Sequence, residues 1–341
     1  MTGATPARQS SRTSQRTSTR SWAGAALRSP RVRLIALGVL AVVAIVIYLG
    51  TDLPRAWEYA LGLRWRTVAG MSIAAAAVGV STILLQTITA NRILTPGIMG
   101  FDAVFLALQV FTVFAIGPVI LFAAPPAASW AVELVLMAGS ITALYWWLFL
   151  RRRLDLHVIV LAGLVLGVLF RSVTSFVQRL LDPETFAILL DLAFASFTSI
   201  QRELLLPTGV LVAAAIASLW PIRRALDVLT LGENTAISLG VEHRRVVIHA
   251  VLAIAVMVAA STALVGPVTF FGLLVANLAY GAVGHRHLHS IPAAVAIGAT
   301  TLLVGQLILD RLLGFGTELP IVIEFVGGLF FIALVLSGRA R

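Results

Sequence analysis

The chain has 341 residues, of which 59% are hydrophobic and 12% charged, and its formal net charge is +10. This composition excludes a water-soluble domain of this length and is typical of a helical membrane protein. The sequence contains neither cysteine nor lysine. It therefore lacks disulfides, thiolate metal sites and cysteine nucleophiles, and it lacks the lysine that a P-loop ATPase places on nucleotide phosphates.

Residues 1–33 are rich in serine, threonine and arginine. Such a segment cannot bury enough apolar surface to fold, so we predict a disordered basic tail in the cytoplasm. Attraction to anionic membrane lipid accounts for its arginines more simply than contact with nucleic acid, and we expect no nucleic-acid partner.

Ten apolar segments follow, each of roughly membrane-spanning length. They are residues 34–50, 67–90, 98–118, 130–150, 156–179, 203–220, 245–265, 268–284, 291–313 and 320–337. Residues 34–341 are thus predicted to form one all-α, polytopic membrane domain. The distribution of arginines places both termini inside. The use of arginine alone for basic residues is typical of a GC-rich bacterial genome, so we expect the bacterial cytoplasmic membrane.

A polar segment, about residues 227–245, separates the sixth and seventh of these segments. Gly232 and Gly240 divide it into two short helical pieces, and its leucines and other apolar residues form one side. The segment is too polar to span a membrane, so we expect it to lie at the membrane surface and contact a partner protein. An ordinary amphipathic helix at the interface is the alternative.

The second apolar segment ends in a motif that contains Gln86, Asn91, Pro96 and Gly100. A helix is expected to reach the inner surface near Asn91, and Thr95-Pro96-Gly97 breaks the chain before the next helix begins. A simple helical bundle would also need such a break, so this motif alone is a weak signal.

Three further blocks occur in order: Leu231-Gly232 with Ser238-Leu239-Gly240-Val241 and Arg244; Gly266-Pro267 with Gly272-Leu273; and Glu318-Leu319-Pro320 with Gly327-Gly328. With the first motif, they resemble the FecCD family, the permease subunits of iron-siderophore and vitamin B12 ABC importers. The resemblance covers about residues 34–337. It implies an all-α permease of about ten transmembrane helices, similar to the vitamin B12 importer permease and of the type II importer class.

The resemblance also implies the partners. These are a second permease subunit, identical or different, two ATP-binding subunits, an extracytoplasmic siderophore-binding protein and the membrane lipid. The chain itself is expected to be no enzyme and to bind no metal or cofactor, because ATP and Mg²⁺ belong to the ATPase. The path is expected between the two permeases, near the second, fifth and eighth spans, without an assignment of residues.

Three groups of site residues follow from the resemblance. ATPase coupling is implied for Leu231, Gly232, Ser238, Leu239, Gly240, Val241 and Arg244, and docking of the binding protein for Arg64, Arg66 and Arg311. The remaining family motif positions are Gln86, Asn91, Pro96, Gly100, Gly266, Pro267, Gly272, Glu318 and Pro320.

Departures from the family pattern bear on the substrate. Asn91-Arg-Ile-Leu-Thr-Pro96 and Val275-Ala-Asn277 look like the branch that serves catecholate siderophores. We therefore expect a ferric siderophore as substrate; vitamin B12 or haem is the alternative. A secondary transporter driven by an ion gradient is a more distant alternative, because no convincing internal repeat supports it. A membrane enzyme or scaffold is another, and no catalytic set of residues supports it.

Several ionisable residues lie in or near the predicted spans. Intramembrane carboxylates are candidates for function, but a structural role is the simpler interpretation here. Glu324, well inside the last predicted span, is the strongest candidate among them. The carboxylates are Asp102, Glu133, Asp191, Asp310 and Glu324. His285, His287 and His289 alternate with other residues, so they cannot share one helix face, and a cytoplasmic turn is the preferred interpretation over a metal site.

Overall fold

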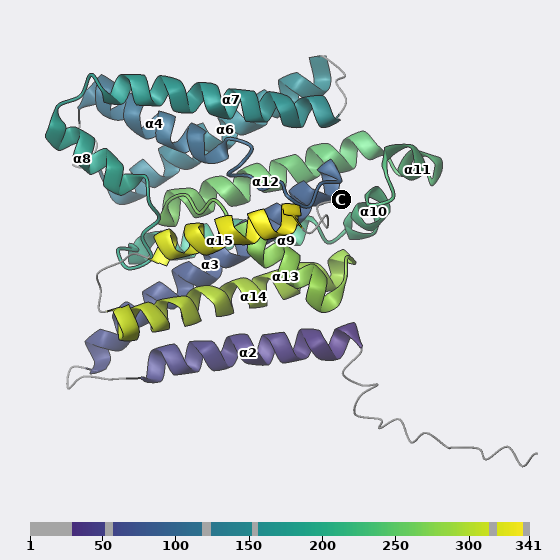
Figure 1. Cartoon of the computed structure of the whole chain (residues 1–341), viewed down its shortest axis with the longest axis horizontal. Coiled ribbons are helices and arrows are strands. Elements are labelled where there is room, and N and C mark those ends of the chain that lie inside the picture. The colour runs from purple at the N-terminus through teal and green to yellow at the C-terminus, as the bar shows by residue number, and fades with distance from the viewer. Residues whose placement is uncertain (1–28, 52–56, 118–123, 152–155, 314–318, 337–341) are drawn as a thin grey trace, which may run out of the picture.

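The computed structural model describes residues 29–51, 57–117, 124–151, 156–313 and 319–336. Within these ranges the chain is a bundle of helices (Figure 1). They are α2 (Pro30–Gly50), α3 (Trp57–Thr89), α4 (Phe101–Ile116), α6 (Pro126–Arg151), α7 (Leu156–Gln178), α8 (Pro183–Leu192), α9 (Arg202–Ser218), α10 (Arg223–Leu229), α11 (Glu233–Ser238), α12 (His243–Val265), α13 (Phe271–Val283), α14 (His287–Ile308) and α15 (Leu319–Leu336). A π-helical turn, Leu309–Leu313, extends α14.

Each of the ten predicted spans coincides with one of these helices, and three of the ten, α4, α9 and α13, are shorter than a full span. In the described part of the chain, seven helices are long and apolar enough to cross a membrane. They become eight if α9 and α10, which meet at 67°, form one bent span. Helices α4 and α13 are apolar but have only 16 and 13 residues, because irregular segments at 92–100 and 266–270 replace their first turns.

The N-terminal boundary also differs from the prediction. Helix α2 begins at Pro30, so residues 30–33, which were expected in the disordered tail, are helical. The Ser29 hydroxyl caps this helix by accepting a hydrogen bond from the Val32 amide, and proline suits the first helical position. Residues 1–28 lie outside the described ranges.

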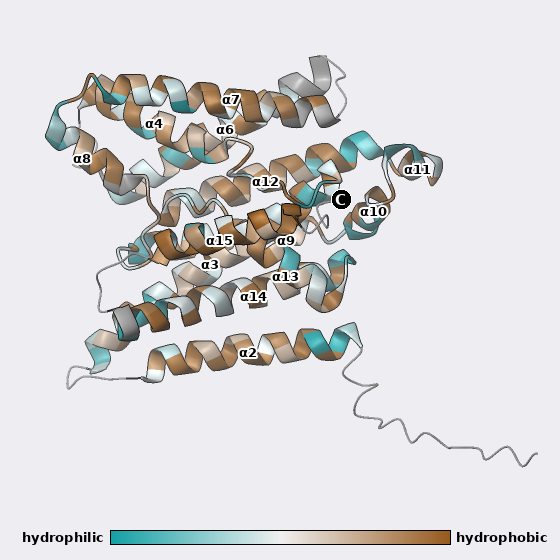
Figure 2. Cartoon of the chain, viewed as in Figure 1, coloured by the Kyte–Doolittle hydropathy of each residue, from teal (hydrophilic) through white to brown (hydrophobic). Residues whose placement is uncertain are grey.

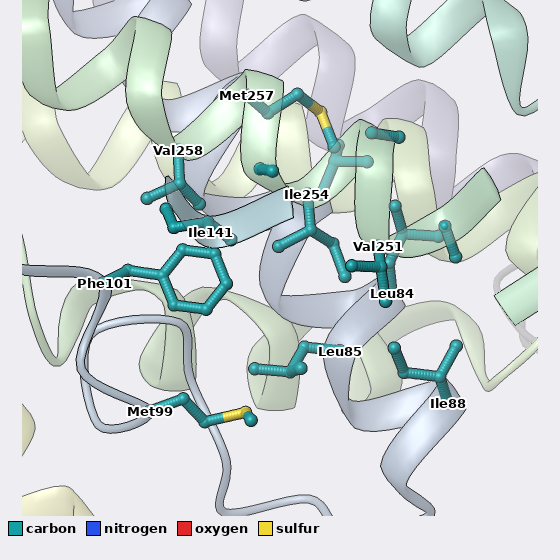
Figure 3. Packing of buried hydrophobic residues seen from close by; sticks show 14 of the residues in the cluster. Leu84, Leu85, Ile88, Met99, Phe101, Ile141, Val251, Ile254, Met257 and Val258 are labelled. Carbon is teal, nitrogen blue, oxygen red and sulfur yellow. The ribbon is translucent and has the colours of Figure 1, made fainter. Parts of the chain in front are cut away.

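Helices α3 and α12 form the centre of the bundle. In each, 72% of the most apolar 18-residue window is buried within this chain, against 17% in α2 and in α15. Helix α3 packs against α12, α14 and α13, and Figure 3 shows its Leu84, Leu85 and Ile88 beside Ile254 and Met257 of α12. The peripheral helices therefore keep broad apolar faces for lipid or for another subunit.

Small and hydroxyl-bearing residues allow the close packing of α3. The hydroxyl of Thr82 donates to the carbonyl of Val78 at 2.8 Å, so a polar group is satisfied inside the helix. Gly272 of α13 lies against this residue, and a Cβ at Gly272 would come within 2.1 Å of the Thr82 Oγ1. The glycine is thus required by the approach of α13 to α3.

The polar elements gather at one end of the bundle. Helices α10 and α11 lie at the end where α2, α12 and α14 begin (Figure 1). Figure 2 shows hydrophilic residues there and at the opposite end, whereas the helix shafts are largely hydrophobic. This separation is the pattern expected for a bundle whose shafts lie in hydrocarbon.

Candidate functional site

The segment formed by α10 and α11 lies at the surface, as the sequence predicted, and its two glycines end helical pieces. Gly232 precedes α11 with φ of 96°, and Gly240 follows it with φ of 80°. At Gly240 the chain forms a Schellman motif, in which the amides of Gly240 and Val241 donate to the carbonyls of Ile237 and Ala236. A residue with a side chain would be strained at either glycine.

This segment was predicted at about residues 227–245, and we call it the coupling segment after the role that the resemblance implies. In the structure it spans residues 223–242, and it has two apolar sides where one was predicted. Leu226, Leu229 and Ala236 are buried against the bundle, whereas Leu231, Ile237 and Leu239 are 61%, 54% and 61% exposed. The other predicted coupling residues, Ser238 and Arg244, are exposed, and Val241 is half-buried. Large apolar side chains that point away from the bundle beside polar ones are typical of a protein-docking surface.

The coupling segment is hydrogen-bonded to the bundle through Asp227 of α10. Its Oδ1 accepts from the backbone amide of His287 at 2.8 Å and contacts the ring Nδ1 of His287 at 2.6 Å. His287 is the first residue of α14 and is 2% exposed. A carboxylate at this position compensates the positive end of the α14 dipole and replaces the missing side-chain cap.

The same histidine continues the connection to α3. Its Nε2 lies 2.9 Å from the hydroxyl of Thr87, in the last turn of α3. Burial raises the pKa of Asp227, but the side-chain and backbone hydrogen bonds from His287 outweigh this effect and hold the pKa below its ordinary value of 3.8. Asp227, His287 and Thr87 thus form a chain of contacts, here called the Asp-His-Thr link, from the coupling segment to α14 and α3.

The motif around Gln86 and Asn91 closes the C-terminal end of α3. Gln86 donates to the carbonyl of Arg92 at 2.7 Å, and the Asn91 side chain accepts from the Ile93 amide at 3.0 Å. Ala90 has φ of 47° and occupies the left-handed position of a second Schellman motif. These residues therefore shape the backbone, which is a structural role for this part of the family motif.

The turn between α13 and α14 holds His285. Arg92 donates to the ring of His285 at 3.3 Å, and Tyr280 packs on that ring at 4.7 Å between centroids. Burial, Arg92 and His287 lower the pKa of His285 from its ordinary value of 6.5. His285 and His287 thus engage separate partners, and in the described ranges we find no group of three side chains that could hold a metal ion.

The later glycine and proline motifs position a set of polar residues inside the membrane domain. Gly100, with φ of 90°, lies against Gly167 of α7, where a Cβ would come within 2.6 Å of the Gly167 Cα. Gly266 has the same φ and lies against Ala195. Pro96 accepts from the amide of Phe101 at 3.2 Å, so the segments on both sides of this set have fixed backbones.

These segments bring together Asp102, Thr269 and Glu324, the intramembrane polar set. The Thr269 hydroxyl lies 3.0 Å from the Asp102 Oδ2 and 3.3 Å from the Glu324 Oε1. Arg171 of α7 lies beside them and donates to the Gly97 carbonyl at 3.4 Å. Four segments distant in the sequence therefore meet around ionisable groups within the membrane domain.

The arginines predicted to dock a binding protein lie at the opposite end of the bundle and have different environments. Arg64 donates to the carbonyls of Tyr48 and Leu49 at 3.3 and 3.4 Å and to that of Thr51, so it closes the C-terminus of α2. Arg66 is half-buried, and Arg311 is exposed in the π-helical turn. Pro320 is buried at the start of α15, whereas Glu318 lies outside the described residues.

A polar cavity of about 430 Å³ opens near the same end, between α4, α6, the segment 194–201 and the end of α12. Gln109 and Glu133 line it and are joined by a hydrogen bond of 2.9 Å. A second cavity of about 480 Å³, between α2, α9 and α14, is lined almost entirely by apolar side chains. Only the first of these cavities has a surface suited to a polar ligand.

The sequence did not predict two features of the site, the contact between Asp227 and His287 and the position of Arg171. Asp227 and His287 are 60 positions apart, and no spacing rule predicts such a contact. Arg171 did carry a signal, because it is a charged residue within a predicted span.

Comparison with known proteins gives consistent matches. A profile of the FecCD transport family matches residues 40–337. The petrobactin import system permease protein YclO of Bacillus subtilis is 34% identical over 308 residues, covering 90% of this chain and 98% of that protein. FatC, a petrobactin import system permease protein of Bacillus anthracis, is 32% identical over 91% of this chain and 88% of its own length.

Two further comparisons extend these matches. FepD, the ferric enterobactin transport system permease protein of Escherichia coli, is 31% identical, covering 79% of this chain and 79% of its own length. A solved chain described as an inward-facing conformation of a metal-chelate type ABC transporter has a TM-score of 0.77 and 22% identity. It covers 90% of this chain and 99% of its own length, which supports the fold.

Proposed function

The chain belongs to the FecCD transport family, and from this membership we propose that it is the permease subunit of an ATP-driven importer of a ferric siderophore across the bacterial cytoplasmic membrane. The observation that carries the proposal is identity above 30% to permeases of petrobactin and ferric enterobactin systems, across most of each chain. The exposed apolar side of the coupling segment supports it, because it is a surface that an ATPase could occupy.

The expected partners follow from the same reasoning. Bacillus anthracis has two petrobactin permease proteins, FatC and FatD, and this chain is similar to both. We therefore propose a pair of permeases, with two ATP-binding subunits on the cytoplasmic side. ATP and Mg²⁺ bind those subunits, and this chain performs no hydrolysis. The exposed Leu231, Ile237 and Leu239 are the proposed contacts with the ATPase.

The binding protein is proposed to dock at the other end. Arg66 and Arg311 are the proposed anchors, because an arginine fork suits carboxylates on a partner. Arg64 is less available for this role, since its guanidinium contacts the end of α2. Both termini of the chain are proposed to be cytoplasmic, on the basis of the arginine distribution.

Movement of the coupling segment can reach the bundle through the Asp-His-Thr link. ATP-driven movement of α10 displaces Asp227, and the hydrogen bonds to His287 transmit the displacement to the start of α14 and the end of α3. Because α3 is the most deeply buried helix together with α12, its displacement repacks the centre of the bundle. Such repacking between discrete arrangements is a general route to alternating access.

A transport assay tests the proposal directly. The chain, its partner permease, ATPase and binding protein are reconstituted in liposomes, and ATP-dependent uptake of a labelled ferric catecholate siderophore is measured. Labelled vitamin B12 and haem are compared in the same vesicles, because one relative at 24% identity is a hemin transport system permease protein. We expect uptake of the siderophore alone. Uptake of vitamin B12 or haem without any siderophore would refute the proposed substrate.

A further inference from the structure

Helix α7 carries a charged residue on an exposed face within its membrane-spanning length. Arg171 is seven residues before the end of α7 at Gln178, or about 10 Å along the helix axis. Arg171 and Ser175 are exposed, and Gln178 is half-buried. These three residues follow the spacing of one helix face, so α7 presents a polar stripe at its outer half.

A polar stripe at this depth does not suit contact with lipid. Arginine within a transmembrane helix almost always faces the bundle interior or a water-filled cavity. Phe176, by contrast, lies on another face of α7 and is 64% exposed, as a residue in contact with lipid would be. The two faces of α7 therefore have different environments in the assembled transporter.

The guanidinium of Arg171 lies beside the intramembrane polar set, and most of its N–H groups make no hydrogen bond within the described residues. One of its five N–H groups reaches the Gly97 carbonyl. Thr269 contacts both Asp102 and Glu324, yet its hydroxyl has a single hydrogen. That hydrogen is therefore shared between the two carboxylates.

Helix α15 presents Glu324 at a similar depth. It is five residues after Leu319, or about 7 Å from the outer end of α15, and its side chain is half-buried. The hydrogen bonds through Thr269 hold it next to Asp102 at the start of α4. Helices α7 and α15 thus contribute ionisable side chains to one region within the membrane domain.

We propose that Arg171 lines the translocation path and contacts the negatively charged oxygen atoms of a ferric chelate as it passes, with Asp102, Thr269 and Glu324 as residues that position the wall of the path. This inference rests on the proposed function and adds the charge class of the substrate. A ferric tris-catecholate is an anion, because its ligands carry more negative charge than the ferric ion neutralises. A planar guanidinium with free donors suits such oxygen atoms.

The natural absence of cysteine permits a direct test of what Arg171 faces. Single-cysteine variants Arg171→Cys, Ser175→Cys and Phe176→Cys are incorporated into the reconstituted transporter and treated with a charged, membrane-impermeant methanethiosulfonate reagent. Such a reagent modifies the thiolate, which forms in water and not in hydrocarbon. We expect modification of Arg171→Cys and Ser175→Cys and none of Phe176→Cys. An unreactive Arg171→Cys, or equal rates for all three variants, would overturn the inference.

A transport measurement tests contact with the chelate. Arg171→Gln should lower the turnover of ferric catecholate uptake by about tenfold, as expected for one lost charge-assisted contact, and leave the KM for the loaded binding protein unchanged. Arg171→Lys should restore part of the turnover, because it keeps the charge. Arg179→Gln, which removes an exposed charge beyond the end of α7, is the matched control and should transport normally.

The remaining outcomes also decide the question. If Arg171→Gln separates the two permeases in size-exclusion chromatography, the residue belongs to the subunit interface and the path assignment is wrong. If turnover is unchanged while the wild-type protein transports the siderophore, the inference fails and the proposed function stands. If the wild-type complex transports no siderophore, the proposed function fails, whereas the labelling of Arg171→Cys still reports whether the residue faces water.

Discussion

Removal of the Asp227 carboxylate should separate ATP hydrolysis from transport. Asp227→Ala deletes both contacts with His287, the 2.8 Å bond to its amide and the 2.6 Å contact with its ring. The ring then keeps only its contact with Thr87. Because the side chain of His287 is buried, water cannot easily replace the lost acceptor.

The size of the effect follows from these contacts. A hydrogen bond to a charged group contributes about 1.5–3 kcal/mol, and loss of a helix cap costs about 1 kcal/mol. The two terms overlap, since one carboxylate makes both contacts, and the Asp227 side chain is 32% exposed, which weakens its electrostatic part. We therefore expect the connection between α10 and α14 to weaken by about 2 kcal/mol, roughly a thirtyfold change in an equilibrium constant.

The assay measures siderophore uptake and ATP hydrolysis in the same proteoliposomes. Asp227→Ala should lower the number of chelates imported per ATP by at least about tenfold, while the ATPase copurifies at the wild-type yield. Asp227→Asn keeps an acceptor for the His287 amide, so its import per ATP should lie between those of the wild type and Asp227→Ala. A wild-type ratio in Asp227→Ala would refute the transmission through the Asp-His-Thr link. Thr235→Ala, at an exposed position of α11, is the control and should leave the ratio unchanged.

The pH dependence of this link has a definite sign. The pKa of Asp227 is lowered in the folded protein, so its contribution is complete above the unfolded pKa and is lost as the pH falls through the folded pKa. That window lies below the ordinary value of 3.8. Titration of Asp227 should therefore leave the coupling ratio constant across the neutral range.

Five further substitutions test the packing and the termini by thermal unfolding of the purified protein. Gly272→Ala should destabilise by about 1–3 kcal/mol, because the new Cβ meets Thr82, whereas Gly281→Ala in the same helix has no atom within 4 Å and should be neutral or slightly stabilising. Ala90→Gly should stabilise by about 1 kcal/mol, since it relieves a left-handed alanine. Arg64→Gln should lower the unfolding temperature by exposing the end of α2, whereas Arg66→Gln should leave it unchanged and weaken binding of the siderophore-binding protein.

The sequence predicted those features of the fold that depend on local pattern. Apolar runs of sufficient length located all ten segments, and Gly232 and Gly240 indicated both breaks of the coupling segment, because few other residues adopt positive φ. Helix lengths were predicted less well. The short α4 and α13 lie inside the bundle. Neighbouring elements satisfy backbone hydrogen bonds of the irregular segments before them. Hydropathy alone could therefore not show where these helices begin.

In the candidate site, too, local features could be predicted from the sequence, whereas contacts between distant segments could not. The apolar residues of the coupling segment could be predicted, but the sequence did not separate those buried against the bundle from the exposed Leu231, Ile237 and Leu239. The pairing of Asp227 with His287 and the meeting of Asp102, Thr269 and Glu324 depend on how distant helices pack. No periodicity encodes such contacts. Glu324 was the intramembrane carboxylate singled out from sequence, and the structure places it in the polar set.

The position of α3 has a consequence for synthesis of the chain. Its close-packed surface is matched by α12, α13 and α14, and α12 begins about 150 residues after α3 ends. At a translation rate of about 5–20 residues per second, α3 waits roughly 10–30 s in the membrane for its first central partner. During that interval Ser81, Thr82 and Gln86, which are buried in the finished protein, contact lipid or a chaperone. A ribosome that stalls before α12 therefore leaves a fragment in which the close-packed surface of α3 lacks its main partner.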